Sequence, residues 1–212
     1  GTHLYRTHRL RSGASLSEVT AAVATAWDVE VRLLPMSDDR VETRITVEGE
    51  GELGFQEYFV GRRHSVPVTA VRFEGASGAR PAPGVLEALS AATRVVVCPS
   101  NPVVSVGPIL AVPGIEQAVA ARRNDVVAVS PIVAGAALKG PADRMLRELG
   151  HEPTVVGVAR LYAPLVGTLV IDSADAGLAA AVEAEGVRCV VTSTVMASPE
   201  AAAALARVVL AA

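Results

Sequence analysis

The order of apolar and polar positions predicts a helix and an antiparallel sheet in the first third of the chain. Residues 16–27 carry apolar side chains at helical spacing, and Ser15 with Glu18 has the spacing of a capping box. Residues 40–47 alternate strictly between polar and apolar side chains, which is typical of a half-exposed antiparallel strand. We predict three further apolar runs as strands, at residues 31–34, 55–60 and 66–73, with Gly49, Gly51, Gly54 and Gly61 among the residues that separate the strands.

The pattern changes after a stretch rich in Gly, Ala and Pro at residues 75–84. Four short apolar runs then follow, at residues 95–98, 126–129, 168–171 and 188–191. Helical segments are predicted between and after them, at residues 85–92, 115–123, 143–149, 177–185 and 199–210. This alternation is typical of βαβ units on a parallel sheet with helices on both faces. We therefore predict an α/β fold in two parts, residues 1–75 and residues 76–212.

Composition excludes several classes of protein. Half of the 212 residues are apolar and 19% are charged, which excludes intrinsic disorder. A net charge of −3 gives no reason to expect nucleic acid or an anionic membrane as a partner, and no apolar run is long enough to span a bilayer. Cys98 and Cys189 are too few for a disulfide framework, so we expect a reducing, cytoplasmic location.

The loops that follow the predicted parallel strands are the first places to look for a site, because ligands bind beyond the carboxyl ends of such strands. Residues 99–108 combine hydroxyls, an amide and a glycine placed before Pro108, which suits the first turn of a helix. Backbone N–H groups at such a turn, with Ser100 and Ser105, would hold a phosphate without a basic side chain. Turn formation alone would also explain this composition.

Other candidates have simpler interpretations beside the functional one. Lys139, the only lysine, could meet an anion but is interpreted as a solvated loop residue. Asp172 could face a ligand at a strand end, whereas Asp175 is interpreted as an N-cap. Asp38 and Asp39 suit either Mg²⁺ or a turn, and turn formation is sufficient to explain them.

Several segments, in the same order along the whole chain, resemble the CofD/FbiA family. The most specific is residues 99–115, which begin PSNPVVSVGP, followed by residues 127–133 and by Gly140-Pro141-Ala142. Shorter matches lie at residues 2–7, 34–39, 55–57 and 170–172. Members of this family are 2-phospho-L-lactate transferases, or their phosphoenolpyruvate-using relatives, of coenzyme F-420 biosynthesis.

The resemblance implies a Rossmann-like, mostly parallel sheet and a magnesium-dependent transferase. The enzyme would move a phospholactyl or phosphoenolpyruvyl group from a guanosine diphosphate conjugate to the terminal hydroxyl of the deazaflavin Fo, releasing GMP. The resemblance implies that the diphosphate or nucleotide is contacted by Ser100, Asn101, Ser105 and Gly107. It also implies that three residues lie near the deazaflavin: Thr2, His3 and Arg6.

The resemblance also implies small-molecule substrates, no nucleic acid or membrane partner, and a homodimer. Family members carry an additional N-terminal third that holds the metal ligands, so we expect this chain to be inactive alone and assign it no catalytic or metal-binding residue. The alternative is a YvcK-like regulator that binds a sugar nucleotide without turnover. Those relatives have a different loop in place of Pro99-Ser100-Asn101-Pro102, so the sequence favours the enzyme. A generic dinucleotide-binding domain lacks support because no GxGxxG motif is present.

Overall fold

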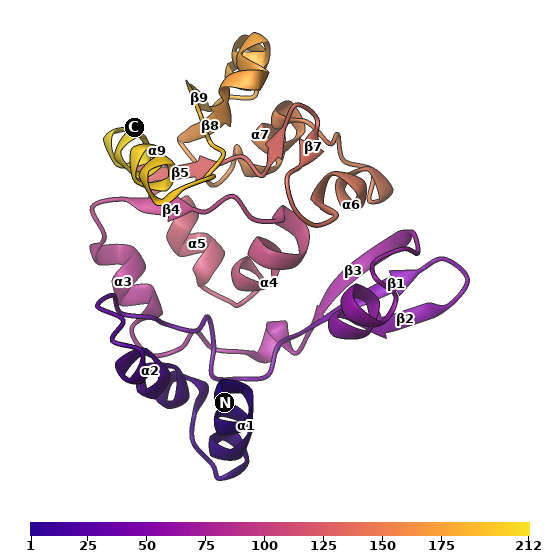
Figure 1. Ribbon diagram of the computed structural model, residues 1–212, viewed down its shortest axis with the longest axis vertical. Coiled ribbons are helices and arrows are strands. Elements are labelled where there is room, and N and C mark those ends of the chain that lie inside the picture. Colours follow the sequence, from indigo (N-terminus) through magenta and orange to yellow (C-terminus); the bar gives the residue numbers. More distant parts are fainter.

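The computed structural model describes residues 1–212 and contains two main sheets and a short hairpin (Figure 1). The antiparallel sheet has the order β2-β1-β3, with β1 (Glu42–Val47), β2 (Gly51–Gly54) and β3 (Val68–Glu74). The parallel sheet has the order β4-β5-β8-β9, with β4 (Val95–Val97), β5 (Val126–Val129), β8 (Thr168–Asp172) and β9 (Arg188–Thr192). The predicted α/β class, with an antiparallel excursion in the first third, is confirmed.

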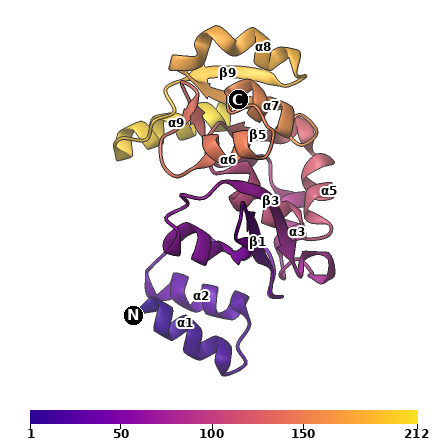
Figure 2. The same ribbon diagram turned by 90° about the vertical axis from the view of Figure 1, so that its right-hand side faces the viewer.

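Two helices at the N-terminal end lie side by side, away from the parallel sheet (Figures 1 and 2). Helix α2 (Leu16–Ala26) begins where predicted, because the Ser15 hydroxyl accepts the Glu18 N–H at 3.1 Å and the Glu18 carboxylate accepts the Ser15 N–H at 2.8 Å. Helix α1 (Thr2–Arg11) was not predicted. It buries none of its residues, so it has no apolar periodicity to detect.

The antiparallel sheet buries one face and exposes the other, as the alternation in residues 40–47 predicts. Ile45, Val47 and Val68 form a small core with Tyr58 and Met145. The predictions of strands at residues 31–34 and 55–60 are wrong. Residues 31–34 pair with no strand, and the second run forms a helical turn that contains η1 (Glu57–Gly61).

Tyr58 explains the turn at residues 55–60. Its side chain is fully buried and its hydroxyl accepts a hydrogen bond from the Arg144 guanidinium at 2.6 Å. The helical backbone also stacks the rings of Phe55 and Phe59, with 5.4 Å between their centroids. A short apolar run is compatible with either a strand or a helix, so its periodicity did not reveal the turn.

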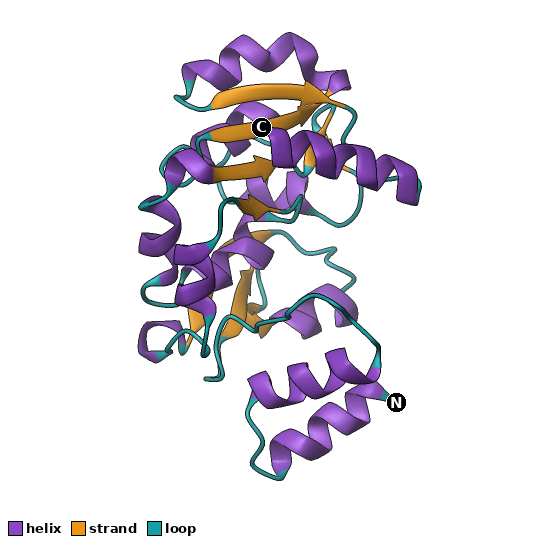
Figure 3. Cartoon of the chain, turned by 90° about the vertical axis from the view of Figure 1, so that its left-hand side faces the viewer, coloured by secondary structure: helices purple, strands orange, loops and turns teal.

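The parallel sheet matches all four predicted strands, and every residue of β5 and β8 is buried. On one face, Val127, Val129 and Val170 pack against α9 (Pro199–Ala211). The opposite face packs against the remaining helices, so helices cover both faces (Figure 3). These helices are α3 (Val85–Ala91), α4 (Gly107–Leu110), α5 (Ile115–Ala120), α6 (Ala142–Glu148), α7 (Val155–Tyr162) and α8 (Ala179–Ala184).

Shorter elements connect the sheets. A hairpin follows β5, formed by β6 (Ile132–Val133) and β7 (Ala136–Ala137), and single turns form η2 (Ala76–Gly78), η3 (Pro102–Val106), η4 (Arg123–Asp125) and η5 (Ser173–Leu178). The predicted boundary at residue 75 falls between β3 and η2. The two parts touch across it, because the Val68 N–H donates to the Glu148 carboxylate at 2.9 Å. None of the helices combines the length and apolar character needed to cross a membrane.

Candidate functional site

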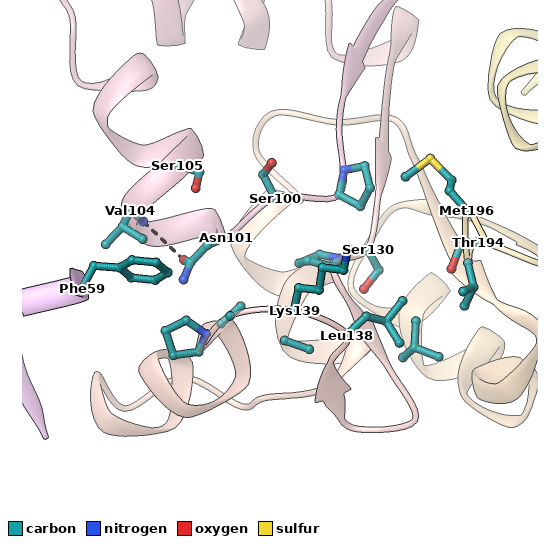
Figure 4. Close-up of a pocket in the computed structure, with 18 of the residues that line it drawn as sticks. Phe59, Ser100, Asn101, Val104, Ser105, Ser130, Leu138, Lys139, Thr194 and Met196 are labelled. Atoms are coloured by element: carbon teal, nitrogen blue, oxygen red, sulfur yellow. Dashed lines mark hydrogen bonds between the residues drawn. The ribbon is translucent and has the colours of Figure 1, made fainter. Parts of the chain in front are cut away.

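A cavity of about 950 Å³ lies beyond the carboxyl ends of β4, β5 and β9 and is bounded on its far side by the turn at residues 55–60 (Figure 4). Its lining comes from four segments of the chain: Phe55, Gln56, Phe59 and Val60; Pro99, Ser100, Asn101, Val104 and Ser105; Ser130, Pro131, Val133 and residues 137–142; and residues 194–197. Strand ends in an open α/β sheet are where ligands bind, so this cavity is the candidate site.

Asn101 shapes the loop that follows β4. Its side-chain oxygen accepts the Val103 N–H at 2.9 Å and the Val104 N–H at 3.3 Å, the second of which is drawn in Figure 4, and so caps η3. These are two of the backbone donors that the sequence predicted for a phosphate. Because Asn101 already occupies them, these two N–H groups are not free to bind a ligand.

The four hydroxyl residues of the lining differ in what they bind. Ser130 accepts the Ile132 N–H and donates to the Ile132 carbonyl, both at 3.1 Å, and Thr194 donates to Asp172 at 3.0 Å. The hydroxyls of Ser100 and Ser105 make no hydrogen bond within the chain. Ser130 and Thr194 therefore stabilise the loops that line the cavity, while Ser100 and Ser105 have hydroxyls available to a ligand.

Asp172 holds the β9 loop rather than facing a ligand. Its carboxylate accepts the N–H groups of Thr194 at 2.7 Å and Ala174 at 2.9 Å. These two backbone donors lower the pKa of the buried Asp172 carboxyl. The interpretation of Asp175 as an N-cap is wrong. Asp172 caps η5, and Asp175 accepts the Ala134 N–H at 2.9 Å from the turn between β6 and β7.

Lys139 is the only charged residue in the lining, and its side chain is exposed at the cavity. No acidic side chain opposes it there. A single ammonium group in a hollow without carboxylates favours an anion. The chain contains no cluster of three or more His, Cys, Asp or Glu side chains that could hold a metal ion. Since Mg²⁺ prefers carboxylate and other oxygen ligands, the lining residues do not fit the part of magnesium ligands.

One wall of the cavity is aromatic and apolar. Phe59 stacks on Phe55 and lies 5.1 Å from the His64 ring, measured between centroids, while Leu138 and Met196 line the cavity from other segments. Sequence reasoning did not single out Phe59, Thr194 or Met196 as site residues. Their positions depend on long-range packing, for which the local pattern holds no signal.

Of the predicted site residues, Ser100, Asn101 and Ser105 lie together in the lining. Gly107 lies outside it, at the start of α4. Its N–H donates to the Pro102 carbonyl, and an added Cβ would meet the Phe73 ring at 2.8 Å, so close packing accounts for this glycine. Thr2, His3 and Arg6 lie on the exposed helix α1 and do not line the cavity. The nucleotide contact of Gly107 and the deazaflavin contacts of these three residues stay predictions.

Solved structures share this fold at low sequence identity. Protein BH3568 from Bacillus halodurans superposes with a TM-score of 0.69 and 16% identity, covering 98% of this chain and 70% of that one. A second structure of the same protein, described as a member of the upf0052 family, has a TM-score of 0.60 and 15% identity, covering 92% of this chain and 66% of that one. At this identity the likeness concerns the fold alone.

Sequence comparisons show the family. Phosphoenolpyruvate transferases from Streptomyces griseus and Kitasatospora aureofaciens are 49% and 48% identical over 97% and 99% of this chain. One from Mycolicibacterium smegmatis is 40% identical over 97% of this chain. The chain spans 66%, 67% and 64% of the length of these three relatives. The sequence model of the family described as "2-phospho-L-lactate transferase CofD" matches residues 1–208, so the chain belongs to the CofD family.

Proposed function

We propose that this chain provides the anion-binding cavity of a coenzyme F-420 transferase. The reaction moves a phospholactyl or phosphoenolpyruvyl group from a guanosine diphosphate conjugate to the terminal hydroxyl of Fo and releases GMP. Membership of the CofD family and relatives named phosphoenolpyruvate transferase support the proposal. The structural observation that carries it is the cavity at the strand ends, with two available hydroxyls, one ammonium group and no carboxylate.

The available donors suit a phosphoryl group that gains charge during transfer. Such a reaction asks the protein mainly to position its substrates and to stabilise developing negative charge. We assign this role to the hydroxyls of Ser100 and Ser105 and to the ammonium group of Lys139. Asn101 acts indirectly in this proposal, because its cap on η3 sets the position of Ser105.

We assign the aromatic wall to a planar ring of one of the substrates. The ring of Phe59 is about one-third exposed at 36% and already stacks on Phe55, so one stacked pair is preformed beside the cavity. Guanine and the deazaflavin both have flat aromatic faces that offset stacking would hold. We assign no residue of this chain to Mg²⁺, which would neutralise the diphosphate when bound. Because this cavity supplies no carboxylate, we also propose that the chain alone does not turn over Fo.

A chimera tests the proposed reaction. This chain would replace the matching part of the Streptomyces griseus relative, and the product would be followed by deazaflavin fluorescence on a chromatogram. We expect conversion of Fo, with Mg²⁺, from the guanosine diphosphate conjugate of phosphoenolpyruvate or of phospholactate. The unmodified relative is the positive control. Tight binding of a sugar nucleotide without conversion from either donor would favour a YvcK-like regulator and contradict the proposal.

A double substitution in the same chimera tests the two hydroxyls. Ser100→Ala with Ser105→Ala should lower kcat on the order of 10²-fold with a smaller change in KM, because the lost donors act mainly on transition-state charge. Ser77→Ala is the matched control, since Ser77 is exposed in η2 and does not line the cavity. Equal kinetics for the double variant and the control would remove both hydroxyls from the site.

A further inference from the structure

Helix α6 lies between the antiparallel sheet and the loops of the parallel sheet (Figure 1). It begins at Ala142, which lines the cavity, and Met145, about one turn later, belongs to the small core of the antiparallel sheet. The side-chain amide of Asn101 donates to the Met145 sulfur at 3.5 Å, so α6 also contacts the loop that follows β4. Side chains of α6 are therefore placed to hold the turn at residues 55–60 against the rest of the cavity.

Arg144 is the side chain of α6 that reaches this turn. Its Nη2 donates to the Tyr58 hydroxyl at 2.6 Å, and the Tyr58 side chain is fully buried. A hydrogen bond from a charged donor is stronger than one between neutral groups, and the low dielectric around a buried acceptor strengthens it further. This hydrogen bond therefore fixes the end of the Tyr58 ring relative to α6.

Glu148 fixes the Arg144 guanidinium in turn. Its Oε1 lies 3.0 Å from Arg144 Nε, one helical turn away, and its Oε2 accepts the Val68 N–H of β3 at 2.9 Å. The Arg144 Nε is buried without an aligned hydrogen-bond acceptor, so its contact with Glu148 is an ion pair rather than a hydrogen bond. Only 16% of the Glu148 side chain is exposed, and solvent and salt screen such a pair less than one at the surface. The donor to Tyr58 is thus held both by its own helix and by the neighbouring sheet.

The backbone that follows Tyr58 depends on its surroundings for its conformation. Arg63 and His64 have positive φ angles of 48° and 44°, which residues other than glycine rarely adopt. Such a conformation persists only where neighbouring groups fix it. The His64 N–H donates to the Tyr58 carbonyl at 3.0 Å, so the anchored Tyr58 is one of the groups that fix it.

Phe59 carries this constraint into the cavity. It follows Tyr58 directly within η1, lines the cavity and contacts the rings of Phe55 and His64. A closely packed interior transmits the displacement of one side chain to its neighbours, so a displaced Tyr58 would displace the Phe59 ring with it.

We propose that Arg144 is a positioning residue for the aromatic wall of the cavity, where its hydrogen bond to Tyr58 sets the place of the Phe59 ring. This role rests on the proposed function, which assigns the aromatic wall to a planar ring of a substrate. Loss of the hydrogen bond should weaken the binding of a ring and leave anion binding unchanged, because the hydroxyls and the ammonium group assigned to the anion lie on other segments of the lining.

Two variants of the 212-residue chain test the hydrogen bond. Arg144→Met keeps an apolar stem but removes the donor, and Tyr58→Phe keeps the buried ring but removes the acceptor. Each should shift the NMR signals of the Phe59 ring protons, because those signals depend on the rings beside it. The double variant should shift them no further than either single variant does, since both substitutions remove the same interaction. If Arg144→Met does not fold, Tyr58→Phe decides the result.

Two further substitutions on α6 are the controls. Arg144→Lys keeps a charged donor on this helix and should restore most of the native Phe59 signals. Arg147→Met removes an arginine from an exposed position of the same helix and should leave those signals as they are in the native chain. Loss of the native signals in both controls would mean that any change in α6 disturbs the wall, and would overturn the specific role of Arg144.

Ligand binding tests the consequence for the cavity. The probes are GMP and Fo, which carry the guanine and deazaflavin rings, and inorganic diphosphate, which carries no ring. Arg144→Met and Tyr58→Phe should each weaken the binding of a ring-bearing probe by about two- to tenfold, the size expected when an aromatic stack is lost. Calorimetry should show the same affinity for diphosphate in both variants as in the native chain.

The outcomes separate this role from the proposed function. Native Phe59 signals in both single variants would overturn the role of Arg144, whatever the ligands do. Altered signals with unchanged affinity for a ring-bearing probe that the native chain binds would overturn it too, as would an equal loss of diphosphate binding. A native chain that binds diphosphate but neither ring would instead contradict the assignment of the wall in the proposed function. The Phe59 signals alone would then decide whether Arg144 positions the ring.

Discussion

The two sheets of this protein are stabilised in different ways. Strands β5 and β8 are buried along their whole length and covered on both faces by helices. The antiparallel sheet buries only one face, and its other face carries a ladder of ion pairs in which Glu52 accepts from Arg44 at 3.1 Å and from Arg72 at 2.5 Å. The difference explains their contributions to the cavity. The loops after three strands of the buried sheet line the cavity, whereas the turn that follows β2 forms one of its walls.

The largest expected effect comes from the centre of the parallel sheet. Leu169→Ala removes a fully buried side chain of β8 and should lower the free energy of unfolding by about 2–5 kcal/mol. Val191→Ala, at a half-exposed position of β9, should cost less than about 1 kcal/mol. Urea unfolding measures both values. Similar losses for the two variants would mean that β8 does not carry the stability of the sheet.

Asp172→Asn should have the next largest effect. It keeps the shape of the side chain but weakens the acceptor of the Thr194 and Ala174 N–H groups, at a cost of about 1–3 kcal/mol. Because folding lowers the pKa of Asp172, its contribution is present above the unfolded pKa and is lost as the pH falls through the folded value. Unfolding curves measured from neutral to acidic pH should therefore show that the variant loses less stability in acid than the native chain does. An equal loss of stability in both proteins would contradict this role.

A pair of substitutions at Asn101 separates its structural role from binding. Asn101→Ala removes the cap of η3 and should lower the free energy of unfolding by about 1 kcal/mol. Asn101→Asp keeps an acceptor for the same two N–H groups, so its stability should stay near that of the native chain. It also places a negative charge in the cavity and should weaken binding of inorganic diphosphate, measured by calorimetry. Unchanged binding in Asn101→Asp would show that the anion does not approach this loop.

The smallest expected effect is on the exposed ladder of the antiparallel sheet. Glu52→Gln should shift the melting temperature by less than Asn101→Ala does, because solvent and salt screen exposed ion pairs. Its two arginine partners lower the pKa of Glu52 from 4.5 to about 2, so the ladder contributes at neutral pH and is lost as the pH falls through that range. Melting curves at low and high salt measure the effect. A shift in melting temperature that persists in high salt would show that salt does not screen these ion pairs, and would contradict the prediction.

Local patterns predicted most of the elements but not their partners. The capping box at Ser15 and the alternation in residues 40–47 are short-range signals, and both correspond to observed elements. The apolar run at residues 55–60 predicts a strand, but its helical conformation goes with a hydrogen bond from Arg144 to Tyr58, two residues far apart in the sequence. Helix α7 was also missed, although Thr154 caps it through the Gly157 N–H at 3.2 Å.

Local sequence patterns are sufficient to predict the α/β class, the four parallel strands and the loop that contains Ser100 and Ser105, because periodicity and turn residues act over a few positions. Three features follow from the folded structure alone: Asn101 binds backbone N–H groups of its own loop, Asp172 accepts hydrogen bonds from Thr194, and Lys139 is the single charged residue in the cavity lining. Those outcomes depend on which strand ends and turns meet in space. Burial and long-range hydrogen bonds determine which of these segments come into contact, and neither leaves a local pattern in the sequence.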